Sequence, residues 1–111
     1  MPSERFIIEQ NIDRLHCRLQ FEESGNNRDM IVKLLFGELD KIKSCGNRFS
    51  ILSLMVARGR VLIDKQRSVV LNLQKDGMDS TVAENLLETL LFCQKSVNQY
   101  AAKDRENTYR N

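Results

Sequence analysis

The feature that most constrains the fold is a regular spacing of apolar residues between Phe49 and Asp76. Seven positions alternate at separations of four and three residues: Leu52, Val56, Gly59, Ile63, Gln66, Val70 and Leu73. This heptad period is typical of a helix that packs lengthwise against another helix. At a rise of about 1.5 Å per residue, the segment predicts a helix about 40 Å long. A helix with this pattern requires a helical partner along its apolar seam.

Two of the seam positions are unusual for a packed helix. Gly59 costs up to about 1 kcal/mol relative to alanine in a helix interior, and we expect the close approach of a partner helix to compensate for it. Gln66 is polar, and a polar seam residue can fix the register of two helices at some cost in stability. Both residues are therefore expected to face the partner helix.

Apolar residues at helical spacing predict three further helices, over about residues 3–23, 28–43 and 81–103. The second of these is expected to end at Cys45-Gly46-Asn47. The chain contains one proline and five glycines among its 111 residues. Because these residues interrupt helices, their scarcity favours long continuous helices.

The expected helix boundaries follow from capping and turn residues. Ser3 is expected to cap the first helix, and Gly25 is expected to end it with a positive φ. Gly77 is expected to end the third helix in the same way. The fourth helix is expected to begin at Asp79, Ser80 or Thr81, and Thr81 and Glu84 fit a capping box there.

A short loop between two long helices makes them antiparallel neighbours. The sequence therefore predicts one all-α domain, residues 1–103, made of two antiparallel helical hairpins, 3–43 and 49–103, that form a four-helix bundle or a coiled-coil-like assembly. Residues 104–111 contain no periodic apolar positions, and we expect a frayed polar tail there. The sequence leaves open whether the two hairpins pack within one chain or between chains.

Charge and composition argue against several classes of function. The 17 Lys and Arg residues alternate with 15 Asp and Glu residues, for a net charge of +2. This mixture is typical of a solvated helix surface rather than of a nucleic-acid-binding face. Aromatic residues make up 6% of the chain and tryptophan is absent, which disfavours an aromatic-lined ligand pocket. No small-molecule substrate is evident from the sequence.

The cysteines and the apolar stretches bear on the compartment. Cys17, Cys45 and Cys93 form no C-x-x-C pair, and an odd number without such spacing favours a reducing cytoplasm over a disulfide framework. The first residues include early acids and no apolar run of signal length. The longest nearly uncharged stretch, residues 49–57, is far shorter than the roughly 20 residues of a membrane span. We therefore expect a cytoplasmic protein without a membrane partner.

Two stretches of the chain carry a resemblance to known sequences. The first consists of Asn11-Ile12-Asp13-Arg14-Leu15, then Leu19, Glu22, Arg28, Leu34-Leu35 and Glu38. The second consists of Val56-Ala57-Arg58-Gly59-Arg60, then Ile63, Gln66, Val70, Leu73, Asp76-Gly77, Asp79, Ala83-Glu84 and Leu86-Leu87-Glu88-Thr89-Leu90. Over most of residues 11–92 the chain resembles small uncharacterised helical-hairpin proteins of rhizobial-type bacteria. The resemblance implies a hairpin fold and a bacterial cytoplasm, and it implies no activity.

His16 is the only histidine of the chain. Histidine phosphotransfer domains resemble a His-x-x-Lys-Gly pattern on a helix, but the run here is His16-Cys17-Arg18-Leu19-Gln20, which lacks the lysine and the glycine. A histidine phosphotransfer-like signalling protein is therefore the less favoured alternative, and a histidine at the edge of the core is the favoured interpretation.

The sequence also lacks the residues that metal binding and nucleophilic catalysis require. His16 and Cys17 point about 100° apart on a helix, so they cannot easily share a metal ion. Nucleophilic catalysis needs a base beside the nucleophile and an orienting group, and the chain has neither a second histidine nor a Gly-rich phosphate loop. We therefore expect no enzyme, no catalytic residues, no cofactor and no metal site.

The densest basic stretch consists of Arg58, Arg60, Lys65 and Arg67, with Arg48 nearby. On a helix these residues spread over the sides of the seam, which favours charge pairing between helices. The alternative is a small nucleic-acid-associated regulator, which the mixed charge disfavours.

The favoured function is a non-enzymatic helical module for protein–protein interaction or self-association, with a homodimer as one form. Apolar side chains of residues 49–76 extend around more than one helix face, and a single partner helix would leave some of them exposed. The residues expected to carry the interaction are Leu52, Met55, Val56, Gly59, Ile63 and Gln66. In a compact monomer the same residues would simply be core.

Overall fold

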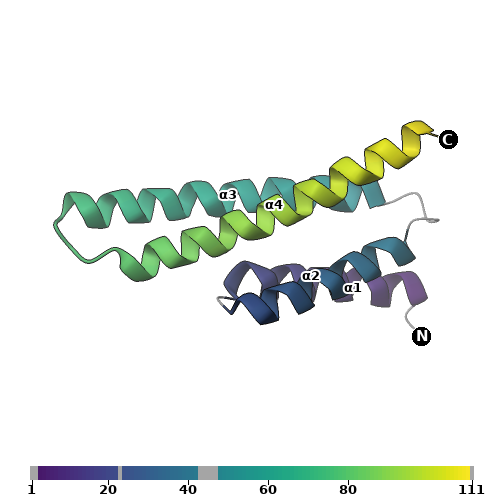
Figure 1. Cartoon of the computed structure of the whole chain (residues 1–111), viewed down its shortest axis with the longest axis horizontal. Helices are drawn as coiled ribbons and strands as arrows, with labels where there is room; N and C mark the ends of the chain where they lie inside the picture. Colours follow the sequence, from purple (N-terminus) through teal and green to yellow (C-terminus); the bar gives the residue numbers. More distant parts are fainter. Residues whose placement is uncertain (1–2, 23, 43–47, 111) are drawn as a thin grey trace.

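A computed structural model describes residues 3–22, 24–42 and 48–110, with the backbone alone for residues 48 and 105–110, and this part of the chain forms four α-helices (Figure 1). The helices are α1 (Glu4–Phe21), α2 (Gly25–Lys41), α3 (Arg48–Lys75) and α4 (Thr81–Arg110). Helix α1 packs against α2, and α3 packs against α4. The predicted all-α fold of two antiparallel hairpins is therefore confirmed.

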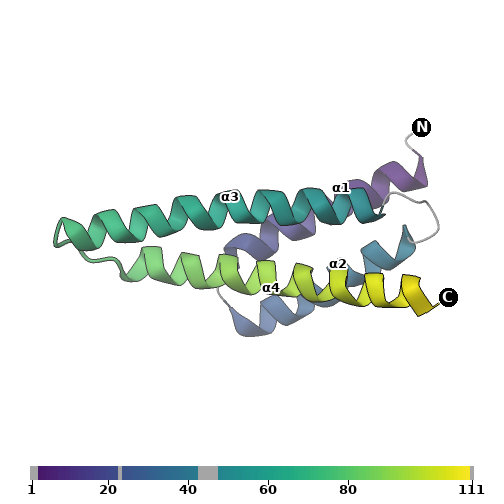
Figure 2. The same cartoon turned by 90° about the horizontal axis from the view of Figure 1, so that it is seen from above.

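The two hairpins pack together within one chain. Buried residues of both hairpins form a single core cluster, whose most deeply buried members are Leu19, Leu35, Leu39, Ile42, Cys93 and Val97. Helix α1 supplies most of the contact with the second hairpin, through α4. Figures 1 and 2 both show the turn end of the α3–α4 hairpin extending beyond the α1–α2 hairpin. The first hairpin therefore covers only part of the second.

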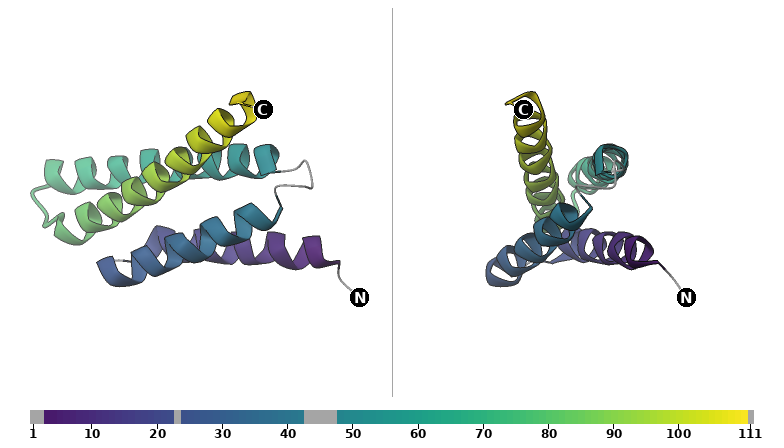
Figure 3. Two further views of the ribbon diagram at one scale, coloured as in Figure 1. Left: turned by 45° about the vertical axis from the view of Figure 1, so that its right-hand side comes forward. Right: turned by 90° about the vertical axis from the view of Figure 1, so that its right-hand side faces the viewer.

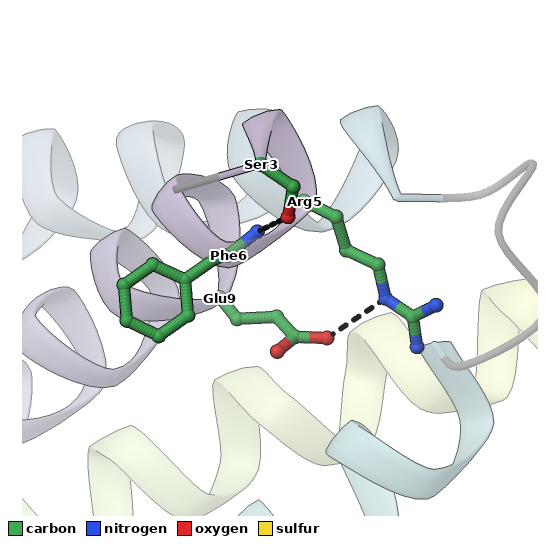
Figure 4. A network of polar contacts seen from close by, with 4 residues as sticks. All are labelled: Ser3, Arg5, Phe6 and Glu9. Carbon is green, nitrogen blue, oxygen red and sulfur yellow. Dashed lines mark hydrogen bonds and ion pairs between the residues drawn. The ribbon is translucent and has the colours of Figure 1, made fainter. Parts of the chain in front are cut away.

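The predicted cap at the start of α1 is confirmed. The Ser3 hydroxyl accepts a hydrogen bond from the Phe6 amide at 3.2 Å (Figure 4). Arg5 and Glu9 form an ion pair one turn apart, at 3.1 Å, on the same exposed side. The cap satisfies one of the amides that the first turn leaves without an internal partner.

The prediction that Gly25 ends α1 is wrong. Gly25 is the first residue of α2, and among the described glycines only Gly77 has a positive φ. Helix α1 ends at Phe21, and the carbonyl of Glu22 accepts a hydrogen bond from the Arg28 guanidinium at 2.7 Å. Because this side chain satisfies the end of the helix, a left-handed glycine is not required there.

The turn between α3 and α4 follows the prediction at one end only. Gly77 has φ of 71° and follows α3 in a Schellman arrangement, with the Met78 amide donating to the Leu73 carbonyl at 2.8 Å. The predicted capping box is wrong, because Thr81 is already helical and its amide and hydroxyl both donate to the Asp79 carboxylate, at 3.0 and 2.7 Å. Both bonds lower the pKa of Asp79, and the bond from the Thr81 hydroxyl has the larger effect.

The C-terminal helix is longer than predicted. Helix α4 continues to Arg110. The segment from residue 104, which was expected to be a frayed tail, is therefore helical as far as Arg110. No glycine or proline follows Gly77 in the chain, and nothing in the sequence therefore breaks the helix after its apolar stripe ends. The predicted stop at Cys45-Gly46-Asn47 lies outside the described residues.

The seam of α3 faces α4. All seven seam residues are buried or half-buried. The Gln94 amide of α4 lies against Gly59, where a Cβ atom would come within 1.9 Å of its Oε1, and Gln94 Nε2 donates to the Val56 carbonyl at 2.9 Å. Gln66 Nε2 donates to the Ala83 carbonyl, also at 2.9 Å. The close approach at Gly59 is confirmed, and both glutamines tie the register of the two helices.

Candidate functional site

Four of the six residues predicted to carry an interaction are buried within the chain. Leu52, Met55 and Ile63 are buried, with exposed fractions of 3, 4 and 6%. Gly59 is also buried, and Val56 and Gln66 are half-buried. Their position matches the other outcome that the sequence left open, the core of a compact chain.

A groove runs between α1 and α3, which pack against other helices more than against each other. Both helices lie on the same side of the molecule when it is viewed along its length (Figure 3). One hollow of about 520 Å³ is lined by Asp13, His16, Cys17, Gln20, Ala57, Arg58, Val61 and Leu62. A second hollow, of about 420 Å³, shares Asp13, His16 and Arg58 with the first. The two hollows form one feature, which we call the α1–α3 groove.

His16 lies at the floor of this groove. Its side chain is 4% exposed, and its Nε2 atom has no hydrogen-bond partner among the described residues. Burial lowers the pKa of His16, with a smaller opposing effect of Asp13 and a further lowering by Arg58. The ring is therefore neutral near pH 7. A buried polar atom without a partner costs roughly 1–3 kcal/mol, which makes this position a candidate site.

Asp13 and Arg58 bridge the groove above His16. The Arg58 Nη1 atom lies 3.2 Å from Asp13 Oδ1, and the two side chains are 56 and 71% exposed. An ion pair in such contact with water contributes about 0–1 kcal/mol. The bridge is therefore weak and easily exchanged for another partner.

The two cysteines whose side chains are described lie in different surroundings. Cys93 is buried, and desolvation raises the pKa of its thiol to about 12. Cys17 is exposed beside the groove, and both thiols are free. No group of three or more His, Cys, Asp and Glu side chains within the described residues is placed to hold a metal ion.

The second candidate surface is the face that the α3–α4 hairpin presents beyond the first hairpin. Met55, Leu62 and Val69 recur every seven residues on α3, so they share one face, and Met55 belongs to the core shared with the first hairpin. On α4, Leu86 lies seven residues before the buried Cys93 and Val82 lies one turn before Leu86, so these residues share one face as well.

This continuation is open to solvent. Val69 is 44% exposed and Val82 is 78% exposed, while Leu73 and Leu86 are half-buried. We call these four residues the uncovered stripe. They lie on α3 and α4, on either side of the turn at Gly77.

The basic residues of α3 do not gather on one surface. Arg58 belongs to the groove, whereas Arg60 lines a separate hollow beside α4. Lys65 and Arg67 are exposed further along the helix. The side chain of Arg48 lies outside the described residues. A contiguous basic face, as phosphate contacts require, is not formed by the side chains described.

No family model, curated protein or solved structure matches the chain. Within the described residues, no helix is long and apolar enough to cross a membrane.

Sequence reasoning placed His16 at the edge of the core but missed the groove above it. The groove joins residues far apart in the chain, as in the pair Asp13 and Arg58, and no spacing in the sequence signals such a contact. The uncovered stripe had a signal, because the apolar residues Met55, Leu62 and Val69 recur every seven residues on α3 and continue past the length that the first hairpin covers.

Proposed function

We propose that the protein is a helical interaction module that self-associates, with two copies meeting through the uncovered stripe. The observation that carries the proposal is the continuity of this stripe with the interface between the two hairpins. The same helix faces bury the first hairpin at one end and stay open at the other. An apolar face exposed in this way usually marks a site of association.

A second copy of the chain is the occupant that this continuity favours. At its covered end, the α3–α4 face already packs against helices of this chain, through residues such as Met55 and Cys93. The projecting end of another copy offers apolar side chains of the same kind and size. Two projecting ends laid side by side in opposite directions form a self-complementary contact with two-fold symmetry.

The steric arrangement supports an antiparallel overlap. The first hairpins occupy one end of each α3–α4 hairpin (Figures 1 and 2). A parallel overlap would bring the two first hairpins into collision, whereas an antiparallel overlap places each projecting end between them. The arrangement completes a four-helix layer from two hairpins, which buries the apolar faces of both.

The test is the mass of the protein in solution, measured by light scattering over a range of concentrations. We expect the apparent mass to rise from that of a 12.9 kDa monomer toward a dimer. Val82→Glu places a charge within the contact and is expected to hold the protein at the monomer mass. Leu71→Glu is the matched control, because Leu71 is 64% exposed on α3 and points away from the stripe.

Circular dichroism of each variant verifies that the helices remain folded. A monomer mass for the unmodified protein at all concentrations would contradict the proposal. An equal loss of association in Val82→Glu and Leu71→Glu would contradict the assignment of the contact to the stripe.

A further inference from the structure

We propose that the α1–α3 groove is a binding site for an amphiphilic monocarboxylate, whose carboxylate pairs with Arg58 and accepts a hydrogen bond from His16 while its apolar chain lies along the groove. This site is separate from the uncovered stripe and does not depend on self-association. It rests on three observations: the hollow, the unpartnered buried imidazole at its floor, and the exchangeable ion pair above it.

The size and the lining of the groove fit a small ligand. Its larger hollow, of about 520 Å³, falls within the range of roughly 300–1,000 Å³ typical of ligand sites. Ala57, Val61 and Leu62 form its apolar wall on α3. The second hollow continues the apolar surface with Ile51 and Leu54. An unbranched apolar chain can therefore remain in contact with α3 on either side of the polar centre.

His16 supplies the reason for a ligand. Its Nε2 atom is buried and has no hydrogen-bond partner among the described residues, while Asp13, three residues earlier on α1, accepts a hydrogen bond from Arg58 at its Oδ1 atom. A neutral imidazole protonated at Nε2 donates one hydrogen bond. A carboxylate placed between His16 and Arg58 satisfies both donors at once, which the Asp13 carboxylate in its present position does not.

The charges around the imidazole favour an anion at this point once Asp13 is displaced. Asp13 and Glu9 are the carboxylates beside His16 on α1, and Arg58 is the charged group that faces it from α3. Glu9 is already paired with Arg5 at 3.1 Å. Asp13 is largely exposed, so it can turn into water when a ligand takes its place. Asp13 is therefore a competitor of the ligand for Arg58.

This competition gives the site an unusual signature in mutagenesis. Asp13→Asn removes the competing charge and is expected to strengthen carboxylate binding. Arg58→Gln removes the partner and is expected to weaken it by about tenfold, the effect of losing one charge-assisted hydrogen bond. Arg67→Gln is the matched control, because it removes a positive charge from an exposed position of α3 that does not line the groove.

The experiment is a titration of the full chain with decanoate, followed by NMR and calorimetry. His16 is the only histidine, so its ring signals report on the floor of the groove without overlap from other histidines. We expect decanoate to shift these signals and to raise the pKa of His16, because a bound carboxylate favours the imidazolium. Decanol and decylammonium serve as head-group controls and are expected to bind more weakly.

Several outcomes would overturn the assignment. Decylammonium binding more tightly than decanoate, with Asp13→Asn weakening it, would make the groove a cation site. Binding of decanol and decanoate with equal affinity would reduce the groove to an apolar surface. Decanoate binding that leaves the His16 signals unmoved, or that Arg67→Gln weakens as much as Arg58→Gln, would place the ligand elsewhere on the molecule.

Discussion

At Gly59, α3 accommodates the side chain of Gln94 from α4 in the space that a Cβ atom would occupy. The Gln94 Oε1 atom would lie 1.9 Å from that Cβ, and its Cδ atom 2.8 Å away. The amide cannot simply swing aside, because it is buried and its Nε2 donates to the Val56 carbonyl. The close contact between Gly59 and the Gln94 side chain therefore offsets the low helix propensity of glycine, and a residue with a Cβ atom would not leave room for it.

Gly59→Ala is expected to lower the free energy of unfolding by up to about 2 kcal/mol, since overpacking costs about 1–3 kcal/mol and alanine returns about 1 kcal/mol of helix propensity. In a Gln94→Ala background the same substitution should become stabilising, because the clash is gone. A double-mutant cycle measured by urea unfolding checks this coupling. Equal effects of Gly59→Ala in both backgrounds would contradict the role assigned to Gln94.

His16 is expected to make the fold sensitive to mild acid. Its pKa in the folded state is lowered from 6.5, with burial as the main cause, so the unfolded chain binds a proton at a higher pH than the folded chain. Stability is therefore full above the unfolded pKa and is lost as the pH falls below about 6.5 toward the folded pKa. The effect is a destabilisation, because burial disfavours the charged ring.

The measurement is urea unfolding of the protein and of His16→Gln between pH 7.5 and 5.5. We expect the unmodified protein to lose stability across this window and the variant to lose less. Most carboxylates titrate below the window, near pH 4, so they contribute little to the difference. Parallel curves for the two proteins would contradict the prediction.

At the scale of the elements, Arg28 fastens the turn of the first hairpin to the second. Its Nη2 atom donates to the buried Thr89 hydroxyl at 2.6 Å, and its Nε atom donates to the Glu22 carbonyl at 2.7 Å. The guanidinium also lies 5.3 Å from the centre of the Phe92 ring. One planar side chain thus ends α1, contacts α4 and shields an aromatic face, which a lysine ammonium cannot reproduce.

Arg28→Ala is expected to destabilise the fold by about 1–3 kcal/mol, since the partly buried, charge-assisted hydrogen bonds to the Glu22 carbonyl and the Thr89 hydroxyl are both lost. Arg28→Lys should recover less than half of the loss, because it lacks the fork that reaches two acceptors. The comparison is made by urea unfolding, with Arg14→Ala as an exposed control on α1. Full recovery by lysine would show that charge alone, and not the geometry of the guanidinium, holds the turn.

The helix interiors were predictable from the sequence, whereas several of the helix ends were not. The seam from Leu52 to Leu73 repeats the same alternation of four-residue and three-residue separations, so the helix is recognisable even though Gly59 and Gln66 are not apolar. A helix end depends on one or two hydrogen bonds for which several groups compete. At the start of α4 the Asp79 carboxylate takes the Thr81 amide, and at the end of α1 a guanidinium from the next helix replaces the expected glycine.

At the scale of the whole molecule, the relation between the hairpins decides which surfaces stay open. Because α1 packs on α4, the side of α1 that carries His16 faces a groove and not a helix. Periodicity assigns residues to faces within one helix but leaves undecided which helix covers each face. Four of the six predicted interaction residues are buried, and the groove and the stripe depend on how the two hairpins are placed against each other.

Self-association through the stripe is expected to change amide exchange in the projecting end of the α3–α4 hairpin and not in its covered end. The projecting end of the α3–α4 hairpin is a two-helix layer, and the exposed side chains of Val69 and Val82 leave its backbone bonds less shielded than those near Met55 and Val97. Amide exchange in a dilute sample is therefore expected to be faster in the segment around Gly77 than in the covered half of α3 and α4.

When the concentration is raised, a dimer should slow exchange in the projecting end and leave α2 nearly unchanged, because binding protects the segments that it covers and stabilises the folded state by mass action. Hydrogen exchange read by mass spectrometry at two concentrations tests this, with Val82→Glu as the variant in which the slowing should vanish. Uniform slowing across all helices would indicate a gain in overall stability without a contact at the stripe. Slowing confined to α1 and the first half of α3 would place the contact at the groove, because the two surfaces occupy different lengths of the same helix.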